Sequence, residues 1–213
     1  MLTLHYYPSN ASMAPHMVLE ELGVPYELAL VDRTRDAHHS PAYLALNPNG
    51  KIPVLVDDDL VLYETAAICL YLADTHPQAG LAPALGTRER AVFYKWLMWL
   101  SNTLQAEMPL YFYSDRWADD AAGTAAVKAH AEARIATMVD QLEAELARHG
   151  GPWLLGETYS LLDPYALMLC RWTRGMARPA RTLPQLGPYL QRVLARPAVQ
   201  RVFTREGLAP PGV

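Results

Sequence analysis

The sequence of 213 residues has only two cysteines, no excess of positive charge and no long apolar run. Cys69 and Cys170 both lie among apolar residues, which is typical of buried thiols in a reducing compartment. The formal net charge of −4 provides no basic field for nucleic acid or an anionic membrane. No apolar run approaches the ~20 residues of a membrane-spanning helix. We therefore expect a cytoplasmic protein that binds neither nucleic acid nor membranes.

Signals for secretion and for metal binding are also missing. Residues 1–5 already read as a strand and have no basic stretch before an apolar one, so we expect no secretory signal. His38 and His39 are adjacent rather than one helical turn apart, so we expect a solvated pair or an anion contact and no metal site. In contrast, 51% of the residues are apolar and 19% are charged, which is enough for a hydrophobic core.

The pattern of the sequence changes after its first third and predicts two domains. Residues 1–76 alternate strand-like and helix-like segments, which fits an α/β domain with a small mixed sheet and a crossover unit. Residues 77–87 are rich in turn formers and read as a linker. Residues 88–213 show helical periodicity and no convincing strand, which predicts an all-α domain. The expected strands are 2–7, 26–31, 52–56 and 60–63, and the expected helices are about 14–22, 41–46, 65–75, 89–111, 121–149, 161–176 and 188–195.

The most informative segment begins with the turn-forming residues 47–50 and continues into the apolar run Ile52 to Val56, with Pro53 inside it. Proline cannot donate to a sheet ladder, so it holds the backbone open here, in the trans form or in the rarer cis form that a tight turn needs. The main-chain groups of Ile52 are then free to pair with an extended peptide, as an added strand would.

A second feature follows the acidic turn 57–59 and the short strand 60–63, where Glu64 and Thr65 precede an apolar helix. Thr65 is a suitable N-cap for that helix. A helix N-terminus offers unpaired N–H groups and partial positive charge, which suits a carboxylate. A strand edge and an anion site a few residues apart suit a small anionic peptide.

These residues resemble the glutathione-binding half of the cytosolic glutathione transferases, a thioredoxin-like domain. The motif Asn-Pro-Asn-Gly-Lys-Ile-Pro-Val-Leu at 47–55, followed by Glu64-Thr65, resembles the cis-proline loop and the γ-glutamyl site of that family. The start of the chain, residues 6–17, is similar to the bacterial beta-class version, and residues 156–167 resemble the capping segment of the helical domain. The three motifs occur in the family's order, so the resemblance covers nearly the whole chain. It implies the two-domain glutathione transferase fold and a homodimer.

The resemblance also implies a reaction and a binding site for glutathione as co-substrate. The reaction is conjugation of the glutathione thiolate to small electrophilic apolar compounds. Ile52 would pair with the cysteinyl unit, Thr65 would hold the γ-glutamyl carboxylate, and Glu64 would receive the ammonium group. The implied glutathione contacts are Lys51, Ile52, Pro53, Glu64 and Thr65, with Arg35 near the glycyl carboxylate.

The residue that activates the thiol is left open by the sequence. A cysteine thiol has a pKa near ~8.5, so the enzyme must favour the thiolate. Ala11 stands where the beta class has its cysteine, which rules out mixed-disulfide chemistry from that position. The candidates are Ser12, as in theta- and delta-like members, then Ser9, as in zeta-like members, Tyr6, as in alpha-, mu- and pi-like members, and the amide of Asn10. Without the resemblance, these serines are ordinary loop or cap residues and Tyr6 is a core aromatic.

The acceptor pocket is expected along the aromatic run 109–117. Beta-class members tend to carry His-Lys facing the thiol, and this chain has Gln105 and Ala106 there, which weakens any transfer of beta-class substrate preference. An aromatic stripe is ordinarily core, but this run is denser than a core needs. The expected lining residues are Tyr111, Tyr113 and Trp117, with Arg116 at the rim.

Residues 160–163, Ser-Leu-Leu-Asp, have the form of a capping box, with Asp163 in place of the usual Glu or Gln, and open a very apolar helix. Pro164 departs from the family, but its missing N–H is tolerable within the first turn. The family's role for this segment is fold nucleation, so we interpret it as structural.

Two other functions remain open. A non-catalytic binding or interaction module would explain the loss of the beta-class cysteine and of the His-Lys pair, although such a module need not keep the intact element 51–65. A glutathione-dependent isomerase, peroxidase or dehalogenase would keep the same co-substrate. The zeta-type isomerase signature is only half present, as Ser9-Asn10-Ala11.

Overall fold

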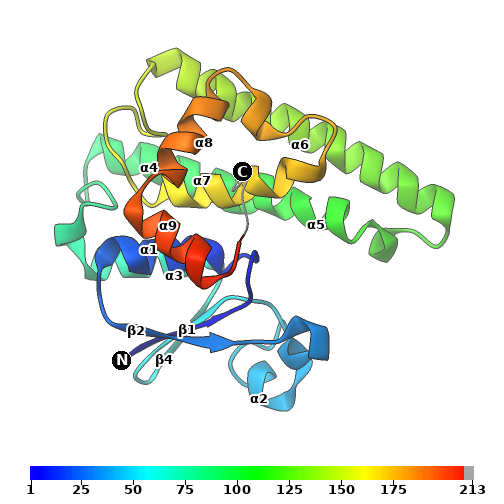
Figure 1. The fold of residues 1–213 in the computed structure, drawn as a ribbon, viewed down its shortest axis with the longest axis horizontal. Coiled ribbons are helices and arrows are strands. Elements are labelled where there is room, and N and C mark those ends of the chain that lie inside the picture. Colours follow the sequence, from blue (N-terminus) through cyan, green and yellow to red (C-terminus); the bar gives the residue numbers. More distant parts are fainter. Residues whose placement is uncertain (209–213) are drawn as a thin grey trace.

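The computed structural model describes residues 1–208, and its N-terminal part is built on a mixed four-stranded sheet (Figure 1). The strands lie in the order β2-β1-β3-β4. Strand β1 (Leu2–Tyr6) pairs in parallel with β2 (Tyr26–Leu30) and antiparallel with β3 (Val54–Asp57), which pairs antiparallel with β4 (Leu60–Tyr63). The mixed sheet confirms the prediction for this part of the chain.

Helices α1 (Met13–Leu22) and α3 (Thr65–Thr75) lie between this sheet and the helical part of the molecule (Figure 1). Helix α1 ends where the sequence predicts, because Gly23 adopts the left-handed conformation and donates its N–H to the Leu19 carbonyl. The short helix α2 (Pro41–Leu44) begins after Ser40, whose hydroxyl accepts from the Tyr43 N–H.

The rest of the described chain is helical. The predicted helix 89–111 is in fact three segments, because a π-helical stretch interrupts the regular α-helical hydrogen bonding. The helix that begins at Pro197 was not predicted, because its apolar side chains span only about two turns and give a weak periodic pattern. The segments are α4 (Arg88–Trp99), the π-helix Leu100–Gln105, α5 (Ala106–Phe112), a 3-10 turn Ser114–Trp117, α6 (Ala121–His149), α7 (Leu162–Trp172), α8 (Leu186–Leu194) and α9 (Pro197–Arg205).

The sheet domain and the helical domain share one hydrophobic core. Leu4 of the sheet, Met17 of α1, Phe93 of α4 and Leu169 of α7 belong to a single cluster of buried side chains. Nearly every residue of α7 is buried, which explains the apolar sequence of this helix. A shared core fixes how the two domains face each other and so fixes the shape of the cavity between them. No helix within residues 1–208 is long and apolar enough to cross a membrane.

Candidate functional site

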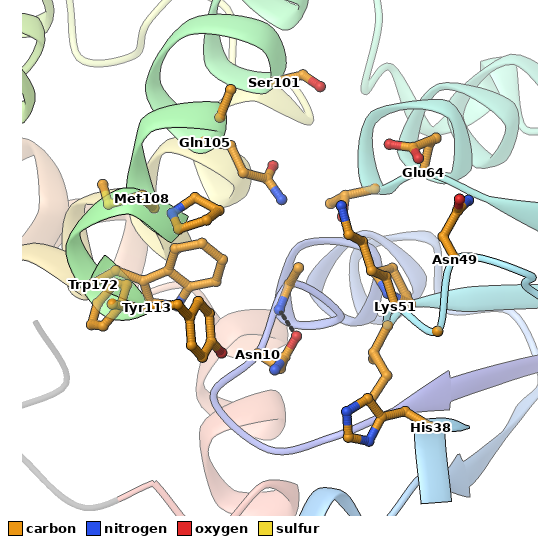
Figure 2. A pocket seen from close by; sticks show the side chains of 18 of the residues that line it. Asn10, His38, Asn49, Lys51, Glu64, Ser101, Gln105, Met108, Tyr113 and Trp172 are labelled. Atoms are coloured by element: carbon orange, nitrogen blue, oxygen red, sulfur yellow. Dashed lines mark hydrogen bonds between the residues drawn. The ribbon is translucent and has the colours of Figure 1, made fainter. Parts of the chain in front are cut away.

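A cavity of about 830 Å³ lies between the two domains. The sheet domain contributes the β1–α1 loop, the residues Arg33, His38 and His39 before α2, Asn47 with the segment 49–53, and the start of α3. The helical domain contributes the π-helix, α5 with the turn after it, and the end of α7. Figure 2 shows polar side chains on one side of this cavity and a wall of Met108, Tyr113 and Trp172 on the other.

The segment before β3 presents an open main chain to the cavity. The Ile52–Pro53 peptide bond is cis, one of the two forms that the sequence allows. The carbonyl of Lys51 accepts hydrogen bonds from Tyr43 Oη at 2.8 Å and from Asn47 Nδ2 at 2.7 Å, which anchor the segment. In the part of the chain that the structure describes, the main chain of Ile52 makes no hydrogen bond. Its N–H and C=O can therefore pair with an extended ligand.

The start of α3 forms the second polar element of the cavity. Glu64, not Thr65, is the N-cap residue, which corrects the sequence-based interpretation. The first bond of the helix runs from the Ile68 N–H to the Glu64 carbonyl at 3.0 Å, so the N–H groups of residues 65–67 have no intrahelical acceptor. Thr65 is buried and Glu64 is exposed, and both line the cavity. This helix start can hold a carboxylate.

The prediction that Arg35 contacts the glycyl carboxylate does not agree with the positions of the cations around the cavity. Arg35 is exposed and does not line the cavity, because it ends a 3-10 turn (Arg33–Arg35) that directs it away. Arg33, two residues earlier, lines the cavity and donates from Nη2 to Tyr113 Oη at 2.9 Å. Lys51, one of the predicted glutathione contacts, lines the cavity, and Figure 2 shows it on the same side as Glu64.

His38 and His39 also line the cavity and form a cluster with Asp36. His39 Nδ1 lies 2.8 Å from Asp36 Oδ1, and His38 Nε2 lies 3.7 Å from the same oxygen. Burial and, after it, the neighbouring His39 lower the pKa of His38, whereas Asp36 raises it. One ligand atom from each residue lies within 4.8 Å of the others, so these three residues could hold a metal ion. The 3-10 turns bring them together, which the adjacent histidines alone did not indicate.

Ser12 and Tyr6, two of the four candidates for thiol activation, do not reach the cavity. The Ser12 side chain is fully buried, donates to the Tyr7 carbonyl at 3.1 Å and accepts from the Tyr7 N–H at 3.2 Å. These two bonds close the β1–α1 loop on itself, so the hydroxyl is structural. Tyr6 is half-buried and packs its ring edge-on against His16, with 6.1 Å between the ring centroids.

Asn10 and Ser9, the other two candidates, line the cavity together with Ala11. The Ala11 N–H donates to Asn10 Oδ1 at 2.7 Å, which fixes the amide and leaves its Nδ2 donor without a partner among residues 1–208. Figure 2 shows Asn10 in the cavity between the wall containing Tyr113 and the side chain of Lys51. The amide donor is therefore the open polar group of this loop.

Ser9 is held by residues that lie far away in the sequence. Its N–H donates to Glu206 Oε2 at 2.8 Å, and its hydroxyl accepts from Arg171 Nη1 at 2.6 Å. The other Glu206 oxygen lies 2.8 Å from His16 Nδ1, and both side chains are buried. The bond from the Ser9 N–H to Glu206 holds Ser9 in its left-handed backbone conformation, in which φ is 60°. Sequence reasoning missed Glu206 and Arg171, because no local pattern links positions so far apart.

The aromatic wall of the cavity agrees in part with the residues predicted for it. Tyr113 and Trp117 line the cavity, whereas Tyr111 does not and places its hydroxyl 3.5 Å from the Gly175 carbonyl. Tyr111 lies one position before Phe112, whose side chain does line the cavity, so the two rings face different ways on the helix. Further lining residues in the helical domain are Ser101, Asn102, Gln105, Ala106, Met108, Pro109, Phe112, Arg116, Tyr165, Trp172 and Arg174.

Comparison with protein families finds two matches along the chain. Residues 8–75 match the profile described as glutathione S-transferase, N-terminal domain, and residues 125–196 match the one described as glutathione S-transferase, C-terminal domain. Glutathione S-transferase GST-4.5 of Xanthomonas campestris pv. campestris is 32% identical over 97% of this chain and 100% of its own length. Glutathione S-transferase GstA of Escherichia coli O157:H7 is 28% identical over 97% of this chain and 100% of its own.

Solved structures of the same fold cover almost all of this chain. A glutathione transferase homologue from Sulfitobacter with bound glutathione has a TM-score of 0.88 at 31% identity, covering 98% of this chain and 99% of its own. A bacterial beta-class glutathione S-transferase from Sphingomonas chungbukensis has a TM-score of 0.84 at 29% identity, covering 97% of this chain and 100% of its own.

Proposed function

The chain belongs to the glutathione S-transferase family, and we propose that it conjugates glutathione to small electrophilic apolar compounds in the cavity between its domains. One arrangement carries this proposal. The open main chain of Ile52 and the open helix start at Thr65 line the same cavity as Asn10, whose Nδ2 donor has no partner within residues 1–208. A non-catalytic binding module would not need a free hydrogen-bond donor in this loop, so the arrangement favours an enzyme.

Glutathione binds in this proposal as an extended peptide along the sheet-domain side of the cavity. Ile52, next to Pro53, pairs with the cysteinyl unit, and the N–H groups and hydroxyl at Thr65 hold the γ-glutamyl carboxylate. Glu64 receives the ammonium group. Lys51, together with the His38–His39 pair, lines the cavity and replaces Arg35 as the contact of the glycyl carboxylate.

Asn10 is the proposed donor to the sulfur. A hydrogen bond to the thiolate stabilises it relative to the thiol and lowers the thiol pKa. Each unit of lowering needs ~1.4 kcal/mol, which a directed donor near the N-terminus of α1 can provide. The thiolate lone pair then forms the carbon–sulfur bond, and the leaving group departs with its electron pair. Ser9, whose hydroxyl hydrogen remains available while its oxygen accepts from Arg171, is the second candidate.

The reaction also suits the compartment that the cysteines indicate. Cys69 and Cys170 are both buried free thiols, and burial raises the pKa of each. Such thiols are unreactive and need no disulfide partner. We place the protein in the cytoplasm, where glutathione is reduced and available as the co-substrate.

Calorimetry and a conjugation assay together test the proposed function. The protein should bind reduced glutathione and should accelerate displacement of chloride from a chloronitrobenzene by the bound thiol. Absence of binding at millimolar glutathione would refute both the site and the reaction. Binding without acceleration for any electrophile would favour the non-catalytic module.

Replacing Glu64 with glutamine should raise the KM for glutathione by about 10-fold, because it removes one charge-assisted contact from an exposed site. Glutamine has nearly the same shape as glutamate. Residue 64 remains a non-glycine residue at its positive φ of 75°, so the substitution should not change the backbone there. Steady-state kinetics with varied glutathione would measure the change. Glu157→Gln, an exposed glutamate outside the cavity, is the matched control and should leave KM unchanged.

The protein should be a homodimer in solution. Strand β4 and helix α4 leave large apolar side chains exposed, and an isologous interface would cover such side chains on both copies. These side chains are Leu60, Val61, Val92 and Met98. Light scattering at micromolar concentration should give twice the 23.7 kDa of one chain. The mass of a single chain would contradict this prediction.

A further inference from the structure

The acceptor side of the cavity combines aromatic walls with positive charge. Its aromatic side chains are Phe112, Tyr113, Trp117 and Trp172. In Figure 2, Tyr113 and Trp172 lie on the side of Asn10 opposite to Lys51 and Glu64. Aromatic walls select for a flat apolar compound, but they do not account for the charge around them.

Arg33, Arg116 and Arg174 line the cavity, and within residues 1–208 none of them forms an ion pair with a carboxylate. Among the described residues, Glu64 is the only acidic residue that lines the cavity. It lies at the start of α3, on the sheet-domain side where glutathione is proposed to bind. The acceptor side therefore holds unbalanced positive charge.

Tyr113 brings two of these guanidinium groups together. Arg33 donates to the Tyr113 hydroxyl at 2.9 Å, and its guanidinium carbon lies 6.0 Å from the centroid of the ring. The guanidinium carbon of Arg116 lies 4.5 Å from the centroid of the same ring. Like charges held around one ring repel each other, and within residues 1–208 each guanidinium has N–H donors without a hydrogen-bond acceptor. An anion between them would remove the repulsion and accept those donors.

The carboxylates of glutathione have other partners in the proposed complex. The γ-glutamyl carboxylate takes the helix start at Thr65, and the glycyl carboxylate takes Lys51 and the histidine pair. Figure 2 shows Lys51 across the cavity from Tyr113, the residue that Arg33 and Arg116 contact. Arg33 and Arg116 are therefore left to face the second substrate.

We propose that the acceptor substrates of this enzyme are aromatic electrophiles that carry a carboxylate, which Arg33 and Arg116 bind while the ring stacks on the aromatic wall. This inference rests on the proposed function. With a chloronitrobenzoate, the thiolate electron pair forms a bond to the ring carbon that carries chlorine. The carbon–chlorine bond then breaks, and chloride leaves with its electron pair. The thiol proton has already passed to solvent when the thiolate forms, so the step needs no other reactant.

A matched pair of electrophiles tests the inference by kinetics. A chloronitrobenzoate and the corresponding chloronitrobenzamide share the ring and the leaving group and differ in one charge. Each kcat/KM is divided by the rate constant of the uncatalysed reaction of the same compound. This ratio should be about 10-fold higher for the benzoate than for the benzamide. Raised ionic strength should reduce the difference, because salt screens the interaction between the carboxylate and the arginines. Equal values for the two compounds would overturn the inference while leaving the proposed function intact.

Variants identify the groups responsible. Arg33→Gln and Arg116→Gln should each lower the benzoate preference by about 3- to 10-fold without raising the KM for glutathione. Arg88→Gln, an exposed arginine at the start of α4 outside the cavity, is the matched control and should keep the preference. A raised KM for glutathione with an unchanged preference would assign Arg33 and Arg116 to the peptide and would overturn the inference.

A binding measurement separates this inference from the failure of catalysis. The two conjugates, carboxynitrophenyl glutathione and its carboxamide, can be prepared chemically and compared by calorimetry without turnover. The carboxylate conjugate should bind about 10-fold more tightly, and Arg116→Gln should bring the two dissociation constants close together. Equal affinities in the unmutated protein would count against the inference, whether or not the protein turns over any electrophile.

Discussion

Replacing Asn10 with alanine should lower kcat/KM for conjugation by about 10- to 100-fold, which corresponds to about 1.4–2.7 kcal/mol, with little change in glutathione affinity. Asn10 lines the cavity and its Nδ2 group has no partner among residues 1–208, so we propose that this group donates to the sulfur of bound glutathione. A donor that binds the thiolate better than the thiol contributes to the reactive state and little to ground-state binding. The loss therefore appears in catalysis.

The ultraviolet absorbance of the thiolate, titrated against pH with glutathione bound, measures this effect directly. The thiol pKa should rise toward ~8.5 in Asn10→Ala. Asn10→Asp keeps the oxygen that accepts from the Ala11 N–H but loses the donor, so it separates the donor from the support of the loop. Its added negative charge should raise the thiol pKa at least as far. An unchanged titration in both variants would remove Asn10 from the mechanism.

The same titration tests whether Ser12 or Ser9 lowers the thiol pKa. Ser12→Ala should leave the thiol pKa unchanged and should lower the free energy of unfolding by about 1–3 kcal/mol, because it leaves the part-buried Tyr7 N–H without its acceptor and removes one of two donors to the Tyr7 carbonyl, which also accepts from the Asn10 N–H. Ser9→Ala tests the second candidate. A thiol pKa that rises in Ser9→Ala and not in Asn10→Ala would transfer the role to Ser9.

Reasoning from the sequence was most informative about the conformation of the main chain. The segment around Ile52 and Pro53 and the helix start at Glu64 and Thr65 are local patterns, so their positions followed from residue type and order. The same reasoning predicted the mixed sheet and the left-handed end of α1 at Gly23. In each case the physical cause lies within a few residues of the effect.

Side-chain directions were harder to predict, because they depend on contacts between distant segments. Ser12 and Asn10 are two residues apart, and only the bonds of Ser12 to Tyr7 show which one is structural. Arg33 and Arg35 differ in the same way, since the 3-10 turn carries one to the cavity and the other to solvent. Glu206, which holds Ser9 from the far end of the chain, had no sequence signal at all.

Asp163, in the first turn of α7, belongs to a local capping pattern, but its carboxylate also bonds to residues outside that segment. The Ser160 N–H donates to Asp163 Oδ2 at 2.8 Å, which is one of the two bonds of the predicted capping box. The N-cap residue is Leu161, however, and the Ser160 hydroxyl accepts from the Leu162 N–H at 3.3 Å. The other oxygen of Asp163, Oδ1, accepts from the Leu154 N–H and from the Tyr189 hydroxyl, each at 2.9 Å. The carboxylate therefore joins α7 to the loop before it and to α8.

Replacing Asp163 with alanine should lower the free energy of unfolding by about 3–5 kcal/mol, because it leaves three buried donors without acceptors. Asp163→Asn keeps the shape but turns one acceptor oxygen into a donor, so its loss should be smaller. Chemical denaturation would measure both. Asp59→Asn, an exposed aspartate in the turn before β4, is the control and should change stability by less than about 0.5 kcal/mol.

The same residue gives stability a pH dependence of definite sign. Burial raises the pKa of Asp163 to about 6, although the N–H donors of Leu154 and Ser160 act in the opposite direction. In the unfolded chain the carboxyl has a pKa near ~3.9, so the native state binds more protons than the unfolded state between these values. The contribution of Asp163 to stability is fully present below about pH 4 and is lost as the pH rises through about 6.

Comparison with Asp163→Asn isolates this dependence, because the other carboxyl groups titrate in both proteins and cancel. The difference in free energy of unfolding, unmutated protein minus variant, should fall by up to about 3 kcal/mol between pH ~4 and ~7, the linkage value for a difference of about two pKa units. Denaturation series at several pH values would trace this difference. If the difference instead rises with pH, the N–H donors outweigh burial, and Asp163 is ionised throughout the range in which the protein is folded.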